Sequence, residues 1–311
     1  MSHSVHSIKD EELNISFSVP RAVSIGIQSD AVCSLAPEQE LLLHAHLPGL
    51  RRLVADSREH DLELVHLESS EPSFEKDRNR FILHDTWNNI TARDLHHLLY
   101  SLAREQFLNQ EIYSVHSSCV RNKKDEKQVL IVGHSGAGKS STALELILQA
   151  DWQIASGNKT LVAFDTKNEM YVQGGTTTMT VRKNQGQHYA QMLGDEIHCY
   201  GNRLAFSLSP ERYVAISEQP ISAIVVVQIQ DGLQEQFELG NRTALNTLYP
   251  LFLDTVNADT ILTKRKGLYR GETPDSAART LAQSLEIAVS EIPILTMAGP
   301  VSFLAEQIQR L

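Results

Sequence analysis

The segment Val129–Ile147 reads VLIVGHSGAGKSSTALELI, and it decides the fold class. It begins with a hydrophobic run, Val129–Val132, that predicts a buried strand, and it ends with apolar residues at helical spacing. Between them lie Gly133, Gly136 and Gly138, which permit backbone conformations that other residues avoid. A strand, a glycine-rich turn and a helix in this order predict an α/β protein.

The same turn satisfies the pattern G-x-x-x-x-G-K-[ST] through Gly133, Gly138, Lys139 and Ser140. Backbone N–H groups of such a loop converge on phosphate oxygens, and the positive end of the following helix adds to the attraction. Lys139 would reach the β- and γ-phosphates, and the Ser140 hydroxyl would ligate Mg²⁺. We therefore expect ATP and Mg²⁺ as cofactors, with GTP left open as the donor. The residues predicted to bind the nucleotide are Gly133, His134, Ser135, Gly136, Ala137, Gly138, Lys139, Ser140 and Ser141.

Composition narrows the class of protein further. The chain has 311 residues, of which 41% are hydrophobic, and this length predicts about two domains. Its net charge of −10 argues against a general binder of nucleic acid or of anionic membranes, because both need a basic surface. Cys33, Cys119 and Cys199 are far apart and odd in number, which is typical of a reducing compartment. No stretch is apolar enough to span a membrane, and we expect a cytoplasmic protein.

Periodic patterns on both sides of the turn suggest how the chain is organised. Before it, strand-like runs at 13–19, 62–67 and 81–83, an irregular charged stretch at 49–61 and a helical pattern at 91–107 predict a small α/β unit over residues 1–110, of unknown role. After it, we expect a hairpin from 160–164 and 170–172, a buried central strand at 223–227, helices at 242–252 and 275–288, and a last strand at IPILTM. Residues 111–311 would form the nucleotide-binding domain.

Several segments around the turn occur in a familiar order. IYSVHSSCV (Ile112–Val120) comes before it, and IASGNKTLVAF, a Gly-Gly-Thr segment and Val181-Arg182 follow it. Over about residues 112–230 this order resembles the HPr kinase/phosphorylase family and its relatives, such as lasso-precursor kinases. The resemblance implies a P-loop core akin to phosphoenolpyruvate carboxykinase, phosphoryl transfer from a nucleotide to a hydroxyl, and a homo-oligomer. The acceptor would be a peptide Ser or Thr, or a small biosynthetic intermediate.

The chain departs from the pattern of that family at two adjacent positions. Where the resemblance implies two aspartates after the helix, this chain has Gly157 and Asn158, and neither side chain accepts a proton. Three hypotheses follow: positioning and charge carry the transfer, His116 is the base, or the domain binds nucleotide without transferring phosphate. The last includes a regulatory or scaffold protein and an ATPase coupled to a partner. The candidate catalytic residues are His116, Lys139 and Asn158.

Further charged residues have two interpretations each. Asp165 ends the apolar run LVAFD and is a metal candidate beside Ser140, although DTKN after that run is more simply a hairpin turn. Lys159, Arg182, Lys183 and Arg270 would either face phosphate or lie on the surface.

Overall fold

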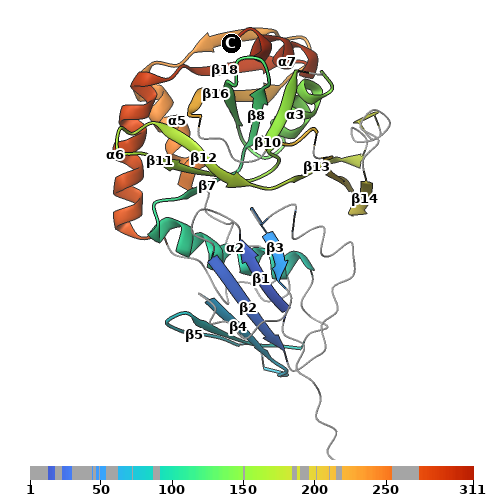
Figure 1. The fold of residues 1–311 in the computed structure, drawn as a ribbon, viewed down its shortest axis with the longest axis vertical. Coiled ribbons are helices and arrows are strands. Elements are labelled where there is room, and N and C mark those ends of the chain that lie inside the picture. Colours follow the sequence, from blue (N-terminus) through green and yellow to red (C-terminus); the bar gives the residue numbers. More distant parts are fainter. Residues whose placement is uncertain are drawn as a thin grey trace, which may run out of the picture.

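The computed structural model describes residues 13–17, 23–29, 44, 47–48, 50–53, 62–71, 73–86, 92–149, 151–183, 188–189, 196–200, 202–209, 211–214, 219–253 and 273–311. Helices and mixed sheets make up the described chain, so the predicted α/β class is confirmed (Figure 1). None of the described helices combines the length and the apolar character that crossing a membrane requires.

A six-stranded sheet forms the centre of the C-terminal half. Its order is β10 (Trp152–Ser156), β8 (Ser118–Asn122), β9 (Gln128–Val132), β16 (Ile221–Ile229), β18 (Ile294–Gly299) and β17 (Glu235–Glu238). Strands β9, β16 and β18 run parallel, whereas β8, β10 and β17 run antiparallel to their neighbours. The run at 223–227 is therefore a central strand, as predicted. Because β9 and β16 are parallel, their carboxyl ends lie at the same edge of the sheet.

Helices cover both faces of this sheet (Figure 1). Alternate side chains of β9 point to opposite faces: Val129 and Ile131 pack with α3 (Lys139–Ile147) and α7 (Val301–Gln309), and Leu130 and Val132 pack with α5 (Asn241–Leu253) and α6 (Asp275–Glu291). Two apolar cores thus hold the sheet from both sides. Helix α7 was not predicted from the sequence.

Two three-stranded antiparallel sheets extend this layer. One has the order β12 (Met170–Gly175), β11 (Thr160–Phe164), β7 (Tyr113–Val115), and the other β13 (Thr178–Arg182), β15 (Arg203–Ser207), β14 (Glu196–Tyr200). The predicted β11–β12 hairpin is confirmed. The chain leaves β7 in one sheet and enters β8 in another, so His116 lies at the bend between them.

The N-terminal unit is a second mixed sheet with one helix. Its strands are β3 (Leu50–Leu53), β1 (Leu13–Phe17), β2 (Val23–Ser29), β4 (Leu62–Leu67), β6 (Arg80–His84) and β5 (Ser73–Asp77), in that spatial order, followed by α2 (Ala92–Asn109). Strand β3 lies in the segment predicted to be irregular, where pairing with β1 overrides the charge of its two arginines.

Helix α2 lies between the N-terminal sheet and the C-terminal half (Figure 1). Its residues 98–104 are all buried, which requires contacts on every side of the helix. The buried Arg104 guanidinium donates to the carbonyl of Leu253 and to Thr273 Oγ1. The predicted boundary near residue 110 falls at the turn after α2, and two separately folding domains stay a prediction.

Cys119 is fully buried in β8, and burial raises the pKa of its thiol to about 12. A raised pKa keeps the thiol protonated, and the thiolate is the form that alkylating reagents attack. We therefore expect native Cys119 to stay unmodified by iodoacetamide at about pH 8, whereas the urea-unfolded protein reacts. Mass spectrometry of the peptide containing Cys119 measures this, and equal labelling of both forms would contradict the burial.

Candidate functional site

The glycine loop, Gly133–Ser140, connects β9 to α3 at the carboxyl edge of the central sheet. Gly133, Gly136 and Gly138 have φ angles of 146°, 86° and 106°, a region that residues with a Cβ avoid. A Cβ on Gly133 would lie 2.9 Å from the carbonyl oxygen of Val227, and one on Gly138 would lie 2.2 Å from Cδ1 of Ile229. The backbone of β16 therefore leaves no room for a Cβ at Gly133, and at Gly138 the Ile229 side chain would have to move to admit one.

A backbone hydrogen bond fixes the loop to the neighbouring strand. The N–H of Ile229 donates to the carbonyl oxygen of Ala137 over 2.8 Å. Helix α3 then begins with Gly138 as its N-cap, without a side-chain cap and without an acidic residue in its first turn. The N–H groups of that turn and the positive end of the helix are therefore available to an anion.

Lys139 is buried although it carries a charge. Its Nζ donates to the carbonyl oxygens of Gly133 at 2.8 Å and of His134 at 3.1 Å, so two of its three donors go to neutral acceptors within the loop. A phosphate oxygen is a stronger acceptor for an ammonium than a carbonyl, because the bond is then assisted by both charges.

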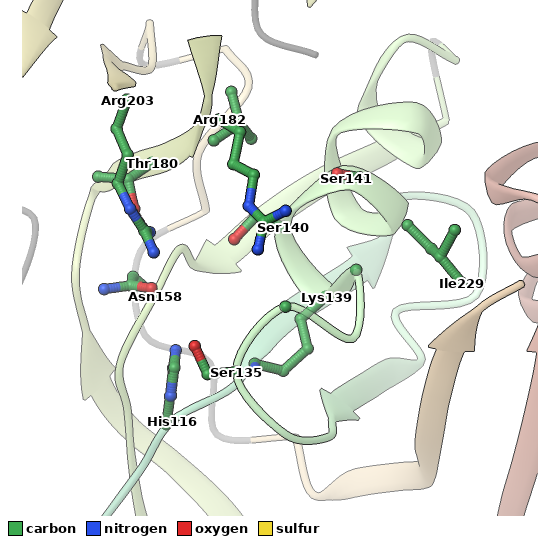
Figure 2. A pocket seen from close by; sticks show the side chains of 13 residues that line it. His116, Ser135, Lys139, Ser140, Ser141, Asn158, Thr180, Arg182, Arg203 and Ile229 are labelled. Carbon is green, nitrogen blue, oxygen red and sulfur yellow. Dashed lines mark hydrogen bonds between the residues drawn. The ribbon is translucent and has the colours of Figure 1, made fainter. Parts of the chain in front are cut away.

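An open cavity of about 660 Å³, a volume that includes solvent space at its mouth, lies in front of the loop (Figure 2). The loop and α3 contribute Ser135, Gly136, Gly138, Lys139, Ser140 and Ser141 to its lining. The remaining walls come from His116, Asn158, Thr180, Val181, Arg182, Arg203 and Ile229. Among the described residues that line the cavity, none is acidic, and three carry a permanent positive charge. The cavity is thus suited to a polyanion.

Asn158 reaches the cavity from a turn between β10 and β11 that is held by a threonine. Thr176 accepts the N–H of Gly157 with its carbonyl oxygen and the N–H of Asn158 with Oγ1, both over 2.7 Å. Ser118 Oγ donates to the Gly157 carbonyl at 2.6 Å. A Cβ on Gly157 would lie 2.8 Å from the Thr178 carbonyl oxygen, so the close approach of the two backbones requires glycine.

A chain of buried hydroxyls lies next to His116. Ser117 Oγ donates to Thr160 Oγ1 over 2.7 Å, and Ser156 Oγ shares a hydrogen bond of 2.6 Å with the same oxygen. These bonds tie the bend carrying His116 to the turn carrying Asn158. The two side chains therefore reach the cavity from one hydrogen-bonded support.

Arg182 and Arg203, on β13 and β15, form one wall of the cavity (Figure 2). They are direct partners in the antiparallel pairing of β13 and β15. A methyl group built on Gly136 would lie 3.6 Å from Nη2 of Arg182, so this guanidinium lies over the loop. Arg203 Nη1 lies 3.4 Å from Thr180 Oγ1.

The structure brings together the three candidate catalytic residues His116, Lys139 and Asn158, which all line the cavity. Three of the predicted nucleotide-binding residues lie outside the lining. Gly133 supports the loop against β16, His134 is exposed, and Ala137 is buried. Thr180 and Arg203 were not predicted as site residues, because the pairing of β15 with β13 has no signal in the sequence.

The structure does not place Asp165 at the predicted metal site. Instead of joining Ser140 at the cavity, it closes the β11–β12 hairpin, where its Oδ1 accepts the N–H groups of Lys167 and Glu169 at 2.8 and 2.9 Å. The Asp side chain satisfies the backbone of a tight turn, and the turn interpretation of DTKN is correct. Lys183 also lies outside the lining, and Arg270 lies outside the described residues.

Tyr189 packs against α3 beside the loop. Its hydroxyl donates to the Ser141 carbonyl over 3.3 Å and lies 3.4 Å from a Glu145 carboxylate oxygen. Burial, together with the Glu145 charge, raises the pKa of Tyr189 well above its ordinary value. The phenol therefore stays a neutral donor that steadies the first turns of α3.

No protein-family model and no curated protein matches the chain. The function must therefore be inferred from the residues of the site and their geometry.

We expect Gly138→Ala to destabilise the protein more than Gly232→Ala, its matched control. Both glycines have positive φ, 106° and 79°, but a Cβ on Gly232 meets nothing within 4 Å. The shared backbone cost is about 1–2 kcal/mol, and the clash with Ile229 adds about 1–3 kcal/mol at Gly138 alone. Urea unfolding measures the difference, and equal losses would show that β16 does not press on the loop.

Lys159 extends from the same turn to α2 instead of into the cavity. Its Nζ lies 3.3 Å from the Tyr100 hydroxyl and 4.4 Å above the centre of that ring. The Tyr100 hydroxyl in turn donates to Ser114 Oγ over 2.9 Å, in a buried position. These contacts connect the N-terminal unit to the turn that carries Asn158.

Tyr100→Phe should therefore lower the free energy of unfolding by about 0.5–1.5 kcal/mol, because the buried Ser114 hydroxyl loses its donor. Tyr171→Phe is the control, since among the described residues its hydroxyl bonds an exposed carboxylate, that of Glu169, and no buried group. We expect that control to change stability by less than about 0.5 kcal/mol. Chemical denaturation compares the two, and an unchanged Tyr100→Phe variant would contradict the link to α2.

Proposed function

We propose that the chain binds a nucleoside triphosphate, ATP or GTP, in this cavity and transfers its terminal phosphoryl group to a hydroxyl. The observation that carries the proposal is the glycine loop, whose amides and α3 N-terminus face a cavity with Lys139 and Arg182 in its walls. Such a loop at the carboxyl ends of parallel strands is where α/β proteins bind phosphate. This geometry supports a P-loop core of the HPr kinase and phosphoenolpyruvate carboxykinase type.

Lys139 and Arg182, the two cations nearest the glycine loop, neutralise the charge of the triphosphate. Lys139 exchanges its carbonyl partners for β- and γ-phosphate oxygens, and Arg182 approaches from above Gly136. Such interactions stabilise the charge that develops in the transition state.

Among the neutral side-chain oxygens that line the cavity, the Ser140 hydroxyl and the Asn158 amide oxygen are the ligands that we assign to Mg²⁺. Mg²⁺ accepts oxygen ligands and is commonly completed by substrate phosphates and water, so this donor set fits an ion that enters with the nucleotide. When bound, the ion would neutralise phosphate charge.

His116 and Asn158 face the acceptor in this proposal. The acceptor oxygen forms a bond to the terminal phosphorus, the bond from phosphorus to the bridging oxygen breaks, and a nucleoside diphosphate leaves. The hydroxyl proton goes to the His116 imidazole, a role that contributes about 10²–10⁴-fold to rate. Because phosphoryl transfer depends mostly on positioning and charge, the neutral Asn158 is compatible with turnover.

One specific observation favours a second function. The turn after β10 presents an amide, Asn158, to the cavity, at the position where the family resemblance implies an acid. An amide supplies neither a base nor a charge. The second candidate is therefore a protein that binds nucleotide as a regulatory or scaffold element and transfers no phosphate. The cytoplasmic location and the homo-oligomeric state stay predictions from the sequence.

The binding half of the proposal is tested with Lys139→Met. Loss of a charged hydrogen bond of about 1.5–3 kcal/mol predicts roughly ten- to hundredfold weaker binding of ATP with Mg²⁺ in calorimetry. Lys183→Met is the control, because Lys183 is exposed and lies outside the cavity lining. Circular dichroism of both variants confirms folding. Unchanged affinity in a folded Lys139→Met variant would reject the site.

The transfer half is tested with water as the acceptor, which requires no knowledge of the natural substrate. We expect slow release of ADP from ATP, reduced at least tenfold in His116→Ala if the imidazole is the base. Asn158→Asp separates the two functions. Faster release than in the natural protein indicates a kinase with a weakened base, and tight ATP binding with no ADP from either protein favours the non-transferring alternative.

A further inference from the structure

Arg182 and Arg203 place two like charges next to each other in the wall of the cavity. Residues directly opposite on antiparallel strands have side chains within a few ångströms, and like charges there are destabilising. Arg182 and Arg203 occupy such a position and both point into the cavity (Figure 2). A bound anion would offset this repulsion.

Three other arginines of the described chain are neutralised by protein carboxylates, whereas Arg104 and Arg212 donate to backbone carbonyls. Arg80, Arg121 and Arg310 pair with Glu63, Glu126 and Glu306. Within the described residues, neither Arg182 nor Arg203 is in an ion pair, and the only side-chain hydrogen bond from either goes from Arg203 to the Thr180 hydroxyl at 3.4 Å. Their charge is therefore available to a ligand in the cavity.

The two guanidinium groups face different parts of that cavity. Arg182 lies over Gly136 and points toward Ser140, on the side of the glycine loop. Arg203 points toward Asn158, on the side of His116 (Figure 2). The first arginine is thus positioned for the triphosphate, and the second for whatever approaches His116.

We infer that Arg203, with the Thr180 hydroxyl, forms an anion subsite for the acceptor, so the substrate that receives phosphate carries an oxyanion of its own. This inference rests on the proposed function, because it assigns the substrate class of the same site. A guanidinium presents two parallel N–H donors that match a carboxylate or a phosphate ester, and such bonds fix orientation as well as charge. Arg203 is then a specificity-determining residue, and neutral alcohols are poor acceptors.

The test uses three probes that share a glycerol-type hydroxyl and differ in their anion: glycerol, glycerate and glycerol 3-phosphate. Each is titrated by calorimetry into the full-length protein, both free and saturated with a non-hydrolysable ATP analogue and Mg²⁺. We expect saturable binding of at least one anionic probe and none of glycerol. The tighter of the two anions identifies the acceptor group as a carboxylate or a phosphate.

Arg203→Gln should weaken binding of the anionic probe about ten- to hundredfold and leave the affinity for the ATP analogue within about twofold. Arg212→Gln is the matched control, since Arg212 lies outside the cavity lining and donates to the Ile147 carbonyl. Equal binding of all three probes, no saturable binding of either anion, or unchanged affinity in Arg203→Gln would overturn the subsite. So would an equal loss of analogue affinity, which would assign Arg203 to the triphosphate.

The two proposals fail in different ways. If the natural protein does not bind the ATP analogue but binds an anionic probe in a manner that depends on Arg203, the proposed function is wrong and the anion subsite stands. If it binds the analogue normally and binds the anionic probes no more tightly than glycerol, the acceptor assignment is wrong and the nucleotide site stands.

Discussion

The site depends on the close approach of the glycine loop to the end of β16. Gly133 and Gly138 leave no room for a Cβ against Val227 and Ile229, and a backbone hydrogen bond from Ile229 to Ala137 closes the contact. With the loop held there, the first turn of α3 opens toward the cavity. The parallel pairing of β9 and β16 sets this geometry, because it brings both carboxyl ends to one edge.

Charge is the second constraint on the cavity. Lys139, Arg182 and Arg203 converge on one space whose described lining contains no acid. In a chain with net charge −10, such a local concentration of positive charge does not come from composition. The polyanion of the proposed function would offset the repulsion between the two arginines. A cavity of this kind selects ligands by their charge and by where each anionic group meets a donor.

The wall opposite the loop is built from neutral groups held by hydroxyls. Thr176 fixes the turn of Asn158, and the buried Ser117–Thr160–Ser156 chain fixes the bend of His116. Buried networks whose members are hydrogen-bonded give rigid positions, which the proposed phosphoryl transfer would require. Two neutral or weakly basic side chains thus lie at defined places in front of a strongly cationic loop.

The sequence by itself determined the α/β class, the strand–loop–helix unit at Val129–Ile147 and the central strand at 223–227, because glycine requirements and hydrophobic runs are local properties. Only the tertiary structure decided which distant residues share the cavity. The register of β13 with β15 aligns Arg182 with Arg203, and the change of sheet after β7 puts His116 at a bend. An aspartate suits both a metal site and a tight turn, so the sequence left both interpretations of Asp165 open, and the hairpin that it closes decided for the turn. Strand pairing between distant segments depends on packing that no short stretch encodes.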